Sequence, residues 1–174
     1  AEAVLARRQA YEELVRVDPL TRLLNRRTFR AELETELARL RRYERSACLL
    51  VLDVRGLADL NRSQGVAVGD LLLTCLSGVV LSSIRNVDLA GRVGGDQIVV
   101  YLPETEPEGA ELLGRRIQER LQRLAEELKG EGLSVLCGIV TAPEDGDTVD
   151  ALLEHANDAL GAAGPTNGER VTRY

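Results

Sequence analysis

Aromatic residues are scarce in this chain of 174 residues. It has no tryptophan and no methionine, a single phenylalanine, and aromatic residues make up only 3% of the total. Hydrophobic residues still reach 44% and charged residues 29%, which is typical of a globular protein and not of a disordered one. Aliphatic side chains and alanine must therefore fill the core, and the length fits one domain of ordinary size.

An excess of positive charge is also missing. The net charge is −6 and the isoelectric point is near 5.0, which argues against a general nucleic-acid-binding protein. No apolar run approaches the ~20 residues of a membrane span, and no signal-peptide pattern opens the chain. We therefore expect no nucleic acid, no membrane contact by this part of the protein, and a cytoplasmic location. Because the sequence lacks an initiator methionine, we expect it to belong to a longer signalling protein.

A cysteine and histidine pattern for metal binding is absent as well. The three cysteines, Cys48, Cys75 and Cys137, lie far apart in apolar runs, and His155 is the only histidine. This spacing does not match a zinc site. We expect buried, reduced thiols of the kind found in cytosolic proteins.

Residues 1–17 form a separate N-terminal segment in our interpretation. Apolar residues recur within 2–17 at three- and four-residue spacing, which predicts an amphipathic helix. This helix could be the end of a signalling or linker helix that pairs with a second copy, or it could lie on its own domain. Pro19 disfavours helix at Asp18, so we place the domain boundary there and assign 18–174 to one domain.

The remaining pattern predicts an α+β fold. We expect helices over 26–44, 68–85, 106–130 and 147–164, with a short helix or turn over 56–65. Strands are expected over 46–54 and 133–143, in a hairpin of 87–93 and 97–103, and at the edge over 169–174. This order is typical of a split-βαβ plan, either ferredoxin-like or palm-type. It implies a mostly antiparallel sheet of about five strands with helices packed on it.

The hairpin turn holds the most unusual local sequence, Gly94-Gly95-Asp96-Gln97. Two glycines supply positive φ angles and leave room for a bulky ligand, although a plain tight hairpin would explain them too. Asp53 ends the first buried strand, which a split-βαβ sheet places beside this hairpin. Two carboxylates at neighbouring strand ends suit Mg²⁺ and a triphosphate. Helix starts near Gly56 and Val68 would add N–H donors for phosphate.

Four segments resemble the GGDEF domain of diguanylate cyclases, and the resemblance covers about residues 18–174. DPLTRLLNRRTF (18–29) is similar to the family's D-x-L-T-G-L-x-N-R-R, and GRVGGDQI (91–98) to its G-R-x-G-G-[DE]-E-F. LDVRGLADLNRSQGVAVGD (52–70) resembles D-I-D-x-F-K-x-x-N-D-x-x-G-H-x-x-G-D. ANDALGAAGPTNGERV (156–171) resembles A-D-x-A-L-Y-x-A-K-x-x-G-R-N-x-V. Several separate motifs thus agree in order and spacing.

The resemblance implies a nucleotidyl cyclase-like fold and a reaction. The family condenses two GTP molecules, held by two facing domains, into cyclic di-GMP, and Mg²⁺ assists the attack of a 3′-hydroxyl on an α-phosphate. Carried over by position, the metal ligands are Asp53, the backbone carbonyl of Val54 and Asp96, and Asp96 with position 97 forms the catalytic signature. Asn61 and Asp70 correspond to the residues that bind guanine.

This sequence departs from the family pattern at charged positions. The acid expected after Asp96 is Gln97, and Arg55 replaces the second aspartate of the first metal motif. Gly164 and Gly168 stand where the pattern has the lysine and arginine that bind phosphate, while Arg170 is out of register. An amide cannot accept the proton of a hydroxyl as a base does. Since one lost donor costs ~10²–10³ in rate, we expect turnover to fall by several powers of ten.

A second motif points to a binding function. Arg85-Asn86-Val87-Asp88 resembles the family's R-x-x-D, the inhibitory site at which an intercalated cyclic di-GMP dimer binds. Arginine stacks on guanine and bonds its Hoogsteen edge, and aspartate accepts from guanine N1 and N2. The alternative is a solvated arginine at a helix end, followed by an aspartate that opens a strand.

Three functional hypotheses follow. The favoured one is a degenerate, non-catalytic GGDEF domain that binds cyclic di-GMP through Arg85 and Asp88. The first alternative is an active diguanylate cyclase that tolerates Gln97, and the second is a scaffold that binds GTP with Mg²⁺, or no nucleotide. Expected partners are cyclic di-GMP, GTP as a second candidate, an upstream sensory domain, and a second copy through the N-terminal helix.

Overall fold

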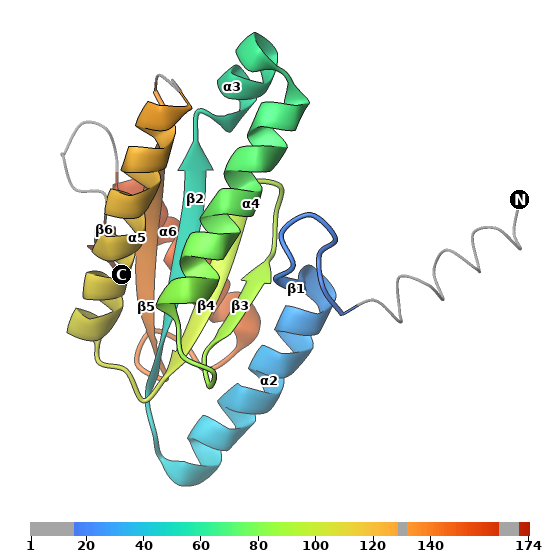
Figure 1. The fold of residues 1–174 in the computed structure, drawn as a ribbon. Helices are drawn as coiled ribbons and strands as arrows, with labels where there is room; N and C mark the ends of the chain where they lie inside the picture. The colour runs from blue at the N-terminus through green and yellow to red at the C-terminus, as the bar shows by residue number, and fades with distance from the viewer. Residues whose placement is uncertain (1–15, 129–131, 164–170) are drawn as a thin grey trace, which may run out of the picture.

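The computed structural model describes residues 16–128, 132–163 and 171–174 (Figure 1). The helix predicted over 2–17 lies almost wholly outside the described residues. Gly164, Gly168 and Arg170 lie outside them too, so the predicted loss of phosphate-binding cations at these positions stays a prediction.

Helices and strands alternate much as the sequence predicts. The helices are α2 (Arg26–Tyr43), α3 (Leu57–Gln64), α4 (Val66–Ser83), α5 (Pro107–Glu127) and α6 (Val149–Ala162). The strands are β1 (Leu24–Asn25), β2 (Ala47–Arg55), β3 (Leu89–Arg92), β4 (Gln97–Pro103), β5 (Ser134–Ala142) and β6 (Val171–Arg173). Side-chain caps begin two helices: Asn25 accepts from the Thr28 N–H, and Thr148 accepts from the Ala151 N–H.

The sheet has six strands in the order β1-β3-β4-β2-β5-β6. β2 lies at its centre and pairs antiparallel with both β4 and β5, while β1 and β6 add parallel at the two edges. The predicted α+β, split-βαβ class is confirmed, with β2 beside the hairpin as expected. The sheet has one strand more than the predicted five, because a two-residue strand such as β1 has no periodicity to detect.

Helices cover both faces of the sheet and create two apolar cores. α4 and α5 pack on one face and α2 and α6 on the other (Figure 1). Successive side chains of β2 alternate between the cores, with Leu50 and Leu52 in the first and Leu49 and Val51 in the second. β2 is therefore apolar on both sides until Asp53, near its end.

Two glycines in the sheet allow close packing. A Cβ on Gly91 in β3 would lie 2.5 Å from the ring of Phe29, and one on Gly138 in β5 would lie 2.3 Å from the Ala156 carbonyl oxygen. The single phenylalanine of the chain thus lies directly over a backbone without a side chain. This contact holds α2 against the hairpin.

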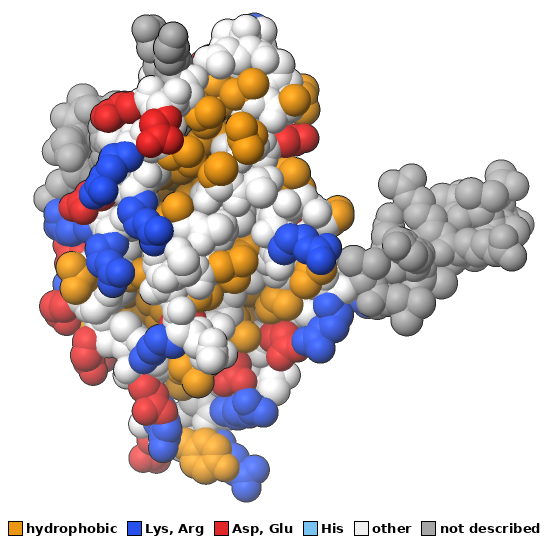
Figure 2. Space-filling model, in the orientation of Figure 1, with side chains coloured by type: hydrophobic (Ala, Val, Ile, Leu, Met, Phe, Trp, Pro, Cys, Tyr) orange, Lys and Arg blue, Asp and Glu red, His pale blue; other side chains and the backbone are white. Residues whose placement is uncertain are grey.

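α4 corrects one expectation from the sequence. Its 18 residues have a mean hydropathy of 1.8 and meet the length and composition of a membrane span, although a third of them are buried inside the domain. Leu72, Leu76 and Val80 face the core, whereas Leu71 and Leu81 are exposed. Figure 2 shows hydrophobic side chains gathered over the upper part of this helix. The expectation that no apolar run approaches a membrane span is therefore wrong for α4.

The cysteines are buried at two of three positions. Cys48 and Cys137 are buried, and burial raises the pKa of the Cys48 thiol to about 11, which keeps it protonated. Cys75 on α4 is only half-buried, contrary to expectation.

Candidate functional site

The hairpin between β3 and β4 brings the predicted metal ligands together. Asp53 pairs in register with Gln97, and the Val54 N–H donates to the backbone carbonyl of Asp96 at 3.0 Å. Contrary to our expectation, neither turn glycine has a positive φ angle. A Cβ on Gly95 would meet no atom within 4 Å, whereas one on Gly94 would lie 3.4 Å from Cβ of Gln97, so the open space at the turn is at Gly95.

Asp53 is buried and already paired with a cation. Its side chain is 12% exposed, and its Oδ2 lies 2.7 Å from Nε of Arg55. Burial raises the pKa of the Asp53 carboxyl and the Asp96 charge raises it further, whereas the Arg55 guanidinium opposes both. The expectation that Arg55 places a positive charge beside the pocket agrees with this geometry.

A divalent metal fits this arrangement poorly. Mg²⁺ prefers several oxygen ligands in an octahedral shell, usually including carboxylates. Asp53 and Asp96 supply two carboxylates, and Asp53 is already paired with Arg55. The described residues contain no group of three or more acidic, histidine or cysteine side chains placed for a metal. The carboxylates have the right chemistry, but their site already holds a positive charge.

The predicted guanine-binding residues lie where α3 meets α4. The Oδ1 atom of Asn61 is buried and has no hydrogen-bond partner among the described residues. Its neighbour is Gly69, where a Cβ would lie 1.8 Å from that oxygen. Asp70, next on α4, is half-buried. A buried, unpaired amide oxygen is costly and usually marks a place for a missing donor.

The Arg85 and Asp88 side chains bind each other. The Asp88 carboxylate accepts from the Arg85 backbone N–H at 2.7 Å and from its Nη2 at 2.9 Å. Nη2 also donates to the Pro103 carbonyl at 3.1 Å and to Oγ1 of Thr105 at 2.9 Å. Asp88 has a side chain only 2% exposed, whereas Arg85 is 56% exposed.

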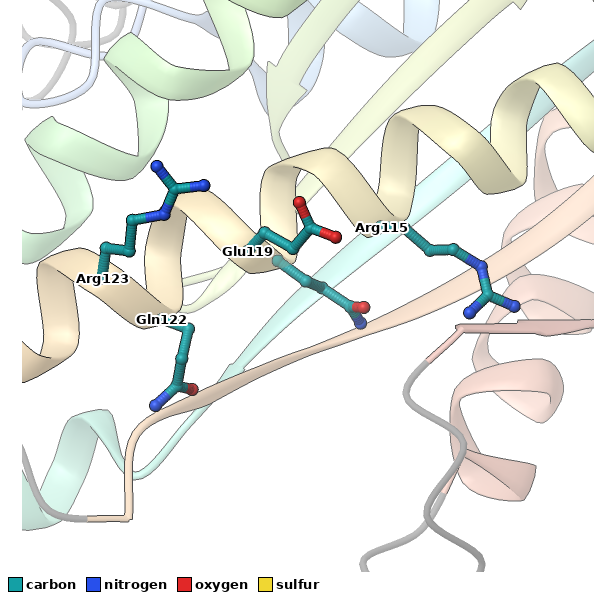
Figure 3. Close-up of a pocket in the computed structure, with 5 residues that line it drawn as sticks. Arg115, Glu119, Gln122 and Arg123 are labelled. Carbon is teal, nitrogen blue, oxygen red and sulfur yellow. The ribbon is translucent and has the colours of Figure 1, made fainter.

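A hollow of about 410 Å³ lies along α5 (Figure 3). Its lining comes entirely from one polar face of that helix, where Figure 3 shows Arg115, Glu119 and Arg123 projecting. None of the predicted site residues lines it. We assign it no role.

Comparison with known proteins decides the family. A model of the family described as "Diguanylate cyclase, GGDEF domain" matches residues 15–170. The chain belongs to the GGDEF domain family. Diguanylate cyclase DgcP of Pseudomonas aeruginosa is 34% identical over 155 residues, which cover 88% of this chain and 23% of DgcP. The chain thus spans about a quarter of the length of that relative.

Solved GGDEF domains share the fold. The GGDEF domain of DgcB from Caulobacter crescentus, in complex with c-di-GMP, superposes with a TM-score of 0.81 at 24% identity, covering 91% of this chain and 95% of that one. A microbial GGDEF domain described in a novel interaction mode with cyclic di-GMP gives a TM-score of 0.75 at 27% identity. That match covers 91% of this chain and 99% of the other. The nucleotidyl cyclase-like architecture predicted from the sequence is confirmed.

The structure adds a GGDEF-domain contact that the sequence reading missed. Oδ1 of Asp18 accepts from the N–H and Oγ1 of Thr21, at 2.8 and 2.7 Å, and from Nη1 of Arg92 at 3.2 Å. Nη2 of Arg92 donates to the Gly95 carbonyl at 2.7 Å. The entry motif is thus tied to the hairpin turn, whereas the sequence identifies Asp18 only as a helix end and as the first residue of that motif. Its motif membership was the available signal.

Asn157 is a second residue that the sequence reading missed. The Nε2 atom of Gln97 donates to its Oδ1 at 2.9 Å, and its own Nδ2 donates to the Leu153 carbonyl. Arg26 and Arg30 line the same hollow of about 270 Å³. The GGDEF pattern has an aspartate at position 157, so the chain carries amides instead of acids at both contacting positions. Both replacements of an acid by an amide can be recognised in the sequence motifs that contain Gln97 and Asn157.

Proposed function

We propose that this GGDEF domain binds cyclic di-GMP at Arg85 and does not synthesise it. The observation that carries the proposal is the fixed, exposed guanidinium of Arg85, held by Asp88, Pro103 and Thr105 with 56% of the side chain exposed. The solved GGDEF domain in complex with cyclic di-GMP at 27% identity supports a ligand of this class.

The chemistry of Arg85 suits a guanine ligand. Among described residues its Nη1 makes no hydrogen bond, so the Nη1 N–H groups and the exposed face of the guanidinium remain for a ligand. Arginine forks onto guanine O6 and N7 and stacks on aromatic rings. The buried Asp88 carboxylate is already bonded to Arg85, so its role in the proposal is to hold Arg85. The direct bond to guanine N1 and N2 expected from the sequence would require Arg85 to release it.

The proposed loss of turnover rests on the edge of the sheet at which the metal ligands Asp53 and Asp96 are predicted. Phosphoryl transfer depends on positioning and on stabilisation of developing charge. Arg55 pairs with Asp53, and Gln97 presents an amide that is bonded to Asn157. These contacts support a non-catalytic domain, in which Asp96 keeps its place without a catalytic acid beside it.

Calorimetric titration of cyclic di-GMP into the domain tests the proposal. Arg85→Ala should weaken binding at least tenfold, because it removes the fork and the stacking plane. Arg39→Ala is the matched control, since Arg39 is an exposed arginine on α2 that pairs with Glu36. Equal binding by the wild type and Arg85→Ala, or no binding by the wild type, contradicts the proposal.

GTP binding is the second candidate function, favoured by the buried, unpaired Oδ1 of Asn61. A guanine base at α3 and α4 would offer donors to this oxygen and to Asp70. Incubation of the domain with GTP and Mg²⁺, followed by chromatography, should yield no cyclic di-GMP. Turnover near that of an intact cyclase would instead establish the alternative, an active diguanylate cyclase.

The domain acts within a longer protein in this proposal. The quarter-length match to DgcP supports additional domains. We propose that one of them is an upstream sensor. Pairing of two copies through residues 1–17 and a cytoplasmic location belong to the same proposal. A scaffold without any nucleotide is the outcome if neither cyclic di-GMP nor GTP binds to the domain in calorimetry.

A further inference from the structure

α4 has a second row of side chains that faces away from the core. Leu72, Leu76 and Val80 are buried in the first core. On the outer side of the helix, five exposed residues follow one another at spacings of four and three positions, and we call them the outer seam: Ala67, Leu71, Thr74, Gly78 and Leu81. Alternating spacings of three and four are typical of the contact between two packed helices. α4 therefore has the pattern of a helix that packs on two sides, although the described residues cover only one of them.

The outer seam can be buried without leaving a polar side chain unpaired. Asp70 is the one charged residue of α4, and it lies outside the seam. Thr74 is the one polar side chain within the seam, and its hydroxyl donates to the Asp70 carbonyl in the same helix at 2.8 Å. Because this hydrogen bond persists when the face is covered, the cost of removing water is low. Leu71 and Leu81 are 50% and 47% exposed, so both would bury further apolar surface.

The outer seam is symmetric in the way that contact with a second copy requires. The sizes of Leu71, Thr74, Gly78 and Leu81 run from large to small to large, and their spacing is the same from either end. If two α4 helices pack antiparallel about a two-fold axis near position 76, Leu71 of each copy lies against Leu81 of the other. Thr74 then lies against Gly78, where a Cβ would meet no atom within 4 Å, so the backbones can approach closely. A two-fold contact pairs one surface with itself in this manner.

Charge does not oppose this arrangement. In the antiparallel pair, Asp70 of one copy lies opposite position 82 of the other. The two Asp70 carboxylates are then separated by about 12 positions, or roughly 18 Å along the helices. This separation exceeds the screening length of about 8 Å at physiological ionic strength, so their repulsion is small.

We infer that the outer seam is a contact between two copies of this domain, which pack antiparallel through α4. The contact needs neither nucleotide nor metal, and it is separate from the proposed cyclic di-GMP site and from the proposed pairing through residues 1–17. A helix of 18 residues is about 27 Å long, so the contact is smaller than the usual interface of about 800 Å² per partner. We therefore expect a weak dimer with a Kd of about 10 to 100 μM.

Sedimentation equilibrium of the wild-type chain without nucleotide tests the inference. Between about 1 and 500 μM, the chain should change from monomer to dimer. Leu71→Lys should weaken the dimer at least tenfold, because it places a charge in the seam. Leu112→Lys is the matched control, since Leu112 is 61% exposed on α5 and lies outside the seam, and this variant should dimerise like the wild type.

A charge exchange tests the antiparallel arrangement. Leu71→Lys and Leu81→Glu should each weaken the dimer, whereas the double variant should recover at least tenfold over either single variant. The recovery is expected because the new lysine of one copy faces the new glutamate of the other. Within one chain the two positions are about 15 Å apart along the helix, which is too far for them to pair with each other.

Gly78→Gln distinguishes a role in the contact from a role in the fold. Glutamine is a better helix former than glycine, and the space at Gly78 is open, so the variant should unfold at a higher urea concentration than the wild type at about 1 μM protein. Its dimer should nevertheless be at least tenfold weaker, because the side chain holds the two helices apart.

Several results would overturn the inference. A wild-type chain that stays monomeric up to 500 μM would show that a second copy does not cover the seam. An oligomer that is unchanged in Leu71→Lys would place the contact elsewhere in the chain. A double charge variant no stronger than the single variants would refute the antiparallel pairing. A monomeric wild type that floats with vesicles of phosphatidylcholine and phosphatidylglycerol, and loses this binding in Leu71→Lys, would assign the face to a lipid surface instead.

Discussion

Two of the arginine–aspartate pairs of this GGDEF domain are Arg55 with Asp53 and Arg85 with Asp88. These two pairs differ in how the arginine is held. Arg55 and Arg85 are equally exposed, at 56%, but their partners Asp53 and Asp88 have side chains 12% and 2% exposed. Arg55 has one close contact, through Nε. Arg85 is bonded through its backbone N–H and its guanidinium to Asp88, and through Nη2 also to β4 and to Thr105.

The difference suggests two roles: Arg55 supplies a positive charge, whereas Arg85 presents a guanidinium group in a fixed orientation. A single ion contact on an exposed arginine adds little stability and leaves the side chain mobile, so Arg55 supplies positive charge to its edge. Several bonds in different directions fix the guanidinium plane, as a stacking and forked ligand contact requires. The identity of the two residues in a pair thus says less about the role of the pair than the hydrogen bonds around it do.

Removal of the Asp88 carboxylate should give the largest loss of stability. Asp88→Ala leaves the Arg85 backbone N–H without its acceptor and releases the guanidinium, and we expect a loss of about 2 kcal/mol in unfolding free energy. Urea unfolding at neutral pH measures it. Asp59→Ala is the matched control, because Asp59 forms an exposed pair with Arg62 at the same spacing and should cost under about 0.5 kcal/mol. Equal losses of unfolding free energy in Asp88→Ala and Asp59→Ala would show that the Arg85–Asp88 pair is held no more firmly than an exposed surface pair.

The pair of Asp18 and Arg92 should give an intermediate, pH-dependent effect. Burial by itself raises the pKa of Asp18, but hydrogen bonds from Thr21 and the nearby Arg92 outweigh it and lower the pKa overall. A lowered pKa in the folded state stabilises the fold above the unfolded value, near 4, and this stabilisation is lost as the pH falls through the folded value. Asp18→Asn should therefore cost about 1 kcal/mol at neutral pH, and this cost should shrink as the pH falls through the folded pKa of Asp18.

Urea unfolding of Asp18→Asn and wild type across this pH range checks the prediction. Arg16→Ala is a suitable control, because Arg16 pairs with Glu32 on the surface and leaves Asp18 intact. A difference that stayed constant from neutral pH to pH 2 would mean that Asp18 acts through shape and not through charge.

The sequence was sufficient to predict most of the fold, because the long elements have strong periodicity. β2 is apolar on both faces and α4 is apolar over most of its length, so the central strand and its neighbours were found within about two residues. β1 was missed because two residues have no period. The hairpin was predicted, but the glycine φ angles were not, since open space at the turn and a positive φ angle favour the same residue.

The candidate site was predictable by residue but not by contact. Motif spacing identified Asp53, Asp96 and Asn61, and the fold places the two carboxylates at one edge. Motif spacing could not show that the Asp88 carboxylate is buried, because the burial of a carboxylate in the turn before β3 depends on the packing of the whole domain around it. The link from Gln97 to Asn157 spans 60 positions, a distance over which local patterns carry no information.

The buried Asp53 carboxylate should destabilise the domain slightly. Burial, with Asp96 adding to it, raises the pKa of Asp53, and Arg55 only partly offsets this. A raised pKa of an acid in the folded state means that the ionised form costs stability above that pKa and costs nothing below the unfolded value. Asp53→Asn should therefore stabilise by about 0.5 kcal/mol at neutral pH, opposite in sign to Asp88→Ala, with no difference near pH 2. Urea unfolding at both pH values decides, and destabilisation at neutral pH would show that the Arg55 contact outweighs burial.

Gln97→Glu should change stability least. The new carboxylate would lose the donor that now bonds to Asn157, but Arg26 and Arg30 line the same hollow and can compensate part of the loss. We expect a change within about 0.5 kcal/mol, which urea unfolding of the variant and the wild type would measure.

Turnover by Gln97→Glu distinguishes the two features proposed to prevent catalysis, the amide of Gln97 and the ion pair of Arg55 with Asp53. Gln97→Glu restores the acid of the family signature but leaves Arg55 on Asp53, so incubation with GTP and Mg²⁺ should still give no cyclic di-GMP by chromatography. Combining it with Arg55→Asp restores both acidic positions and should give at least a trace of product, because the metal edge regains its negative charge. Product from Gln97→Glu alone would mean that the amide, and not the ion pair at Asp53, is what stops the reaction.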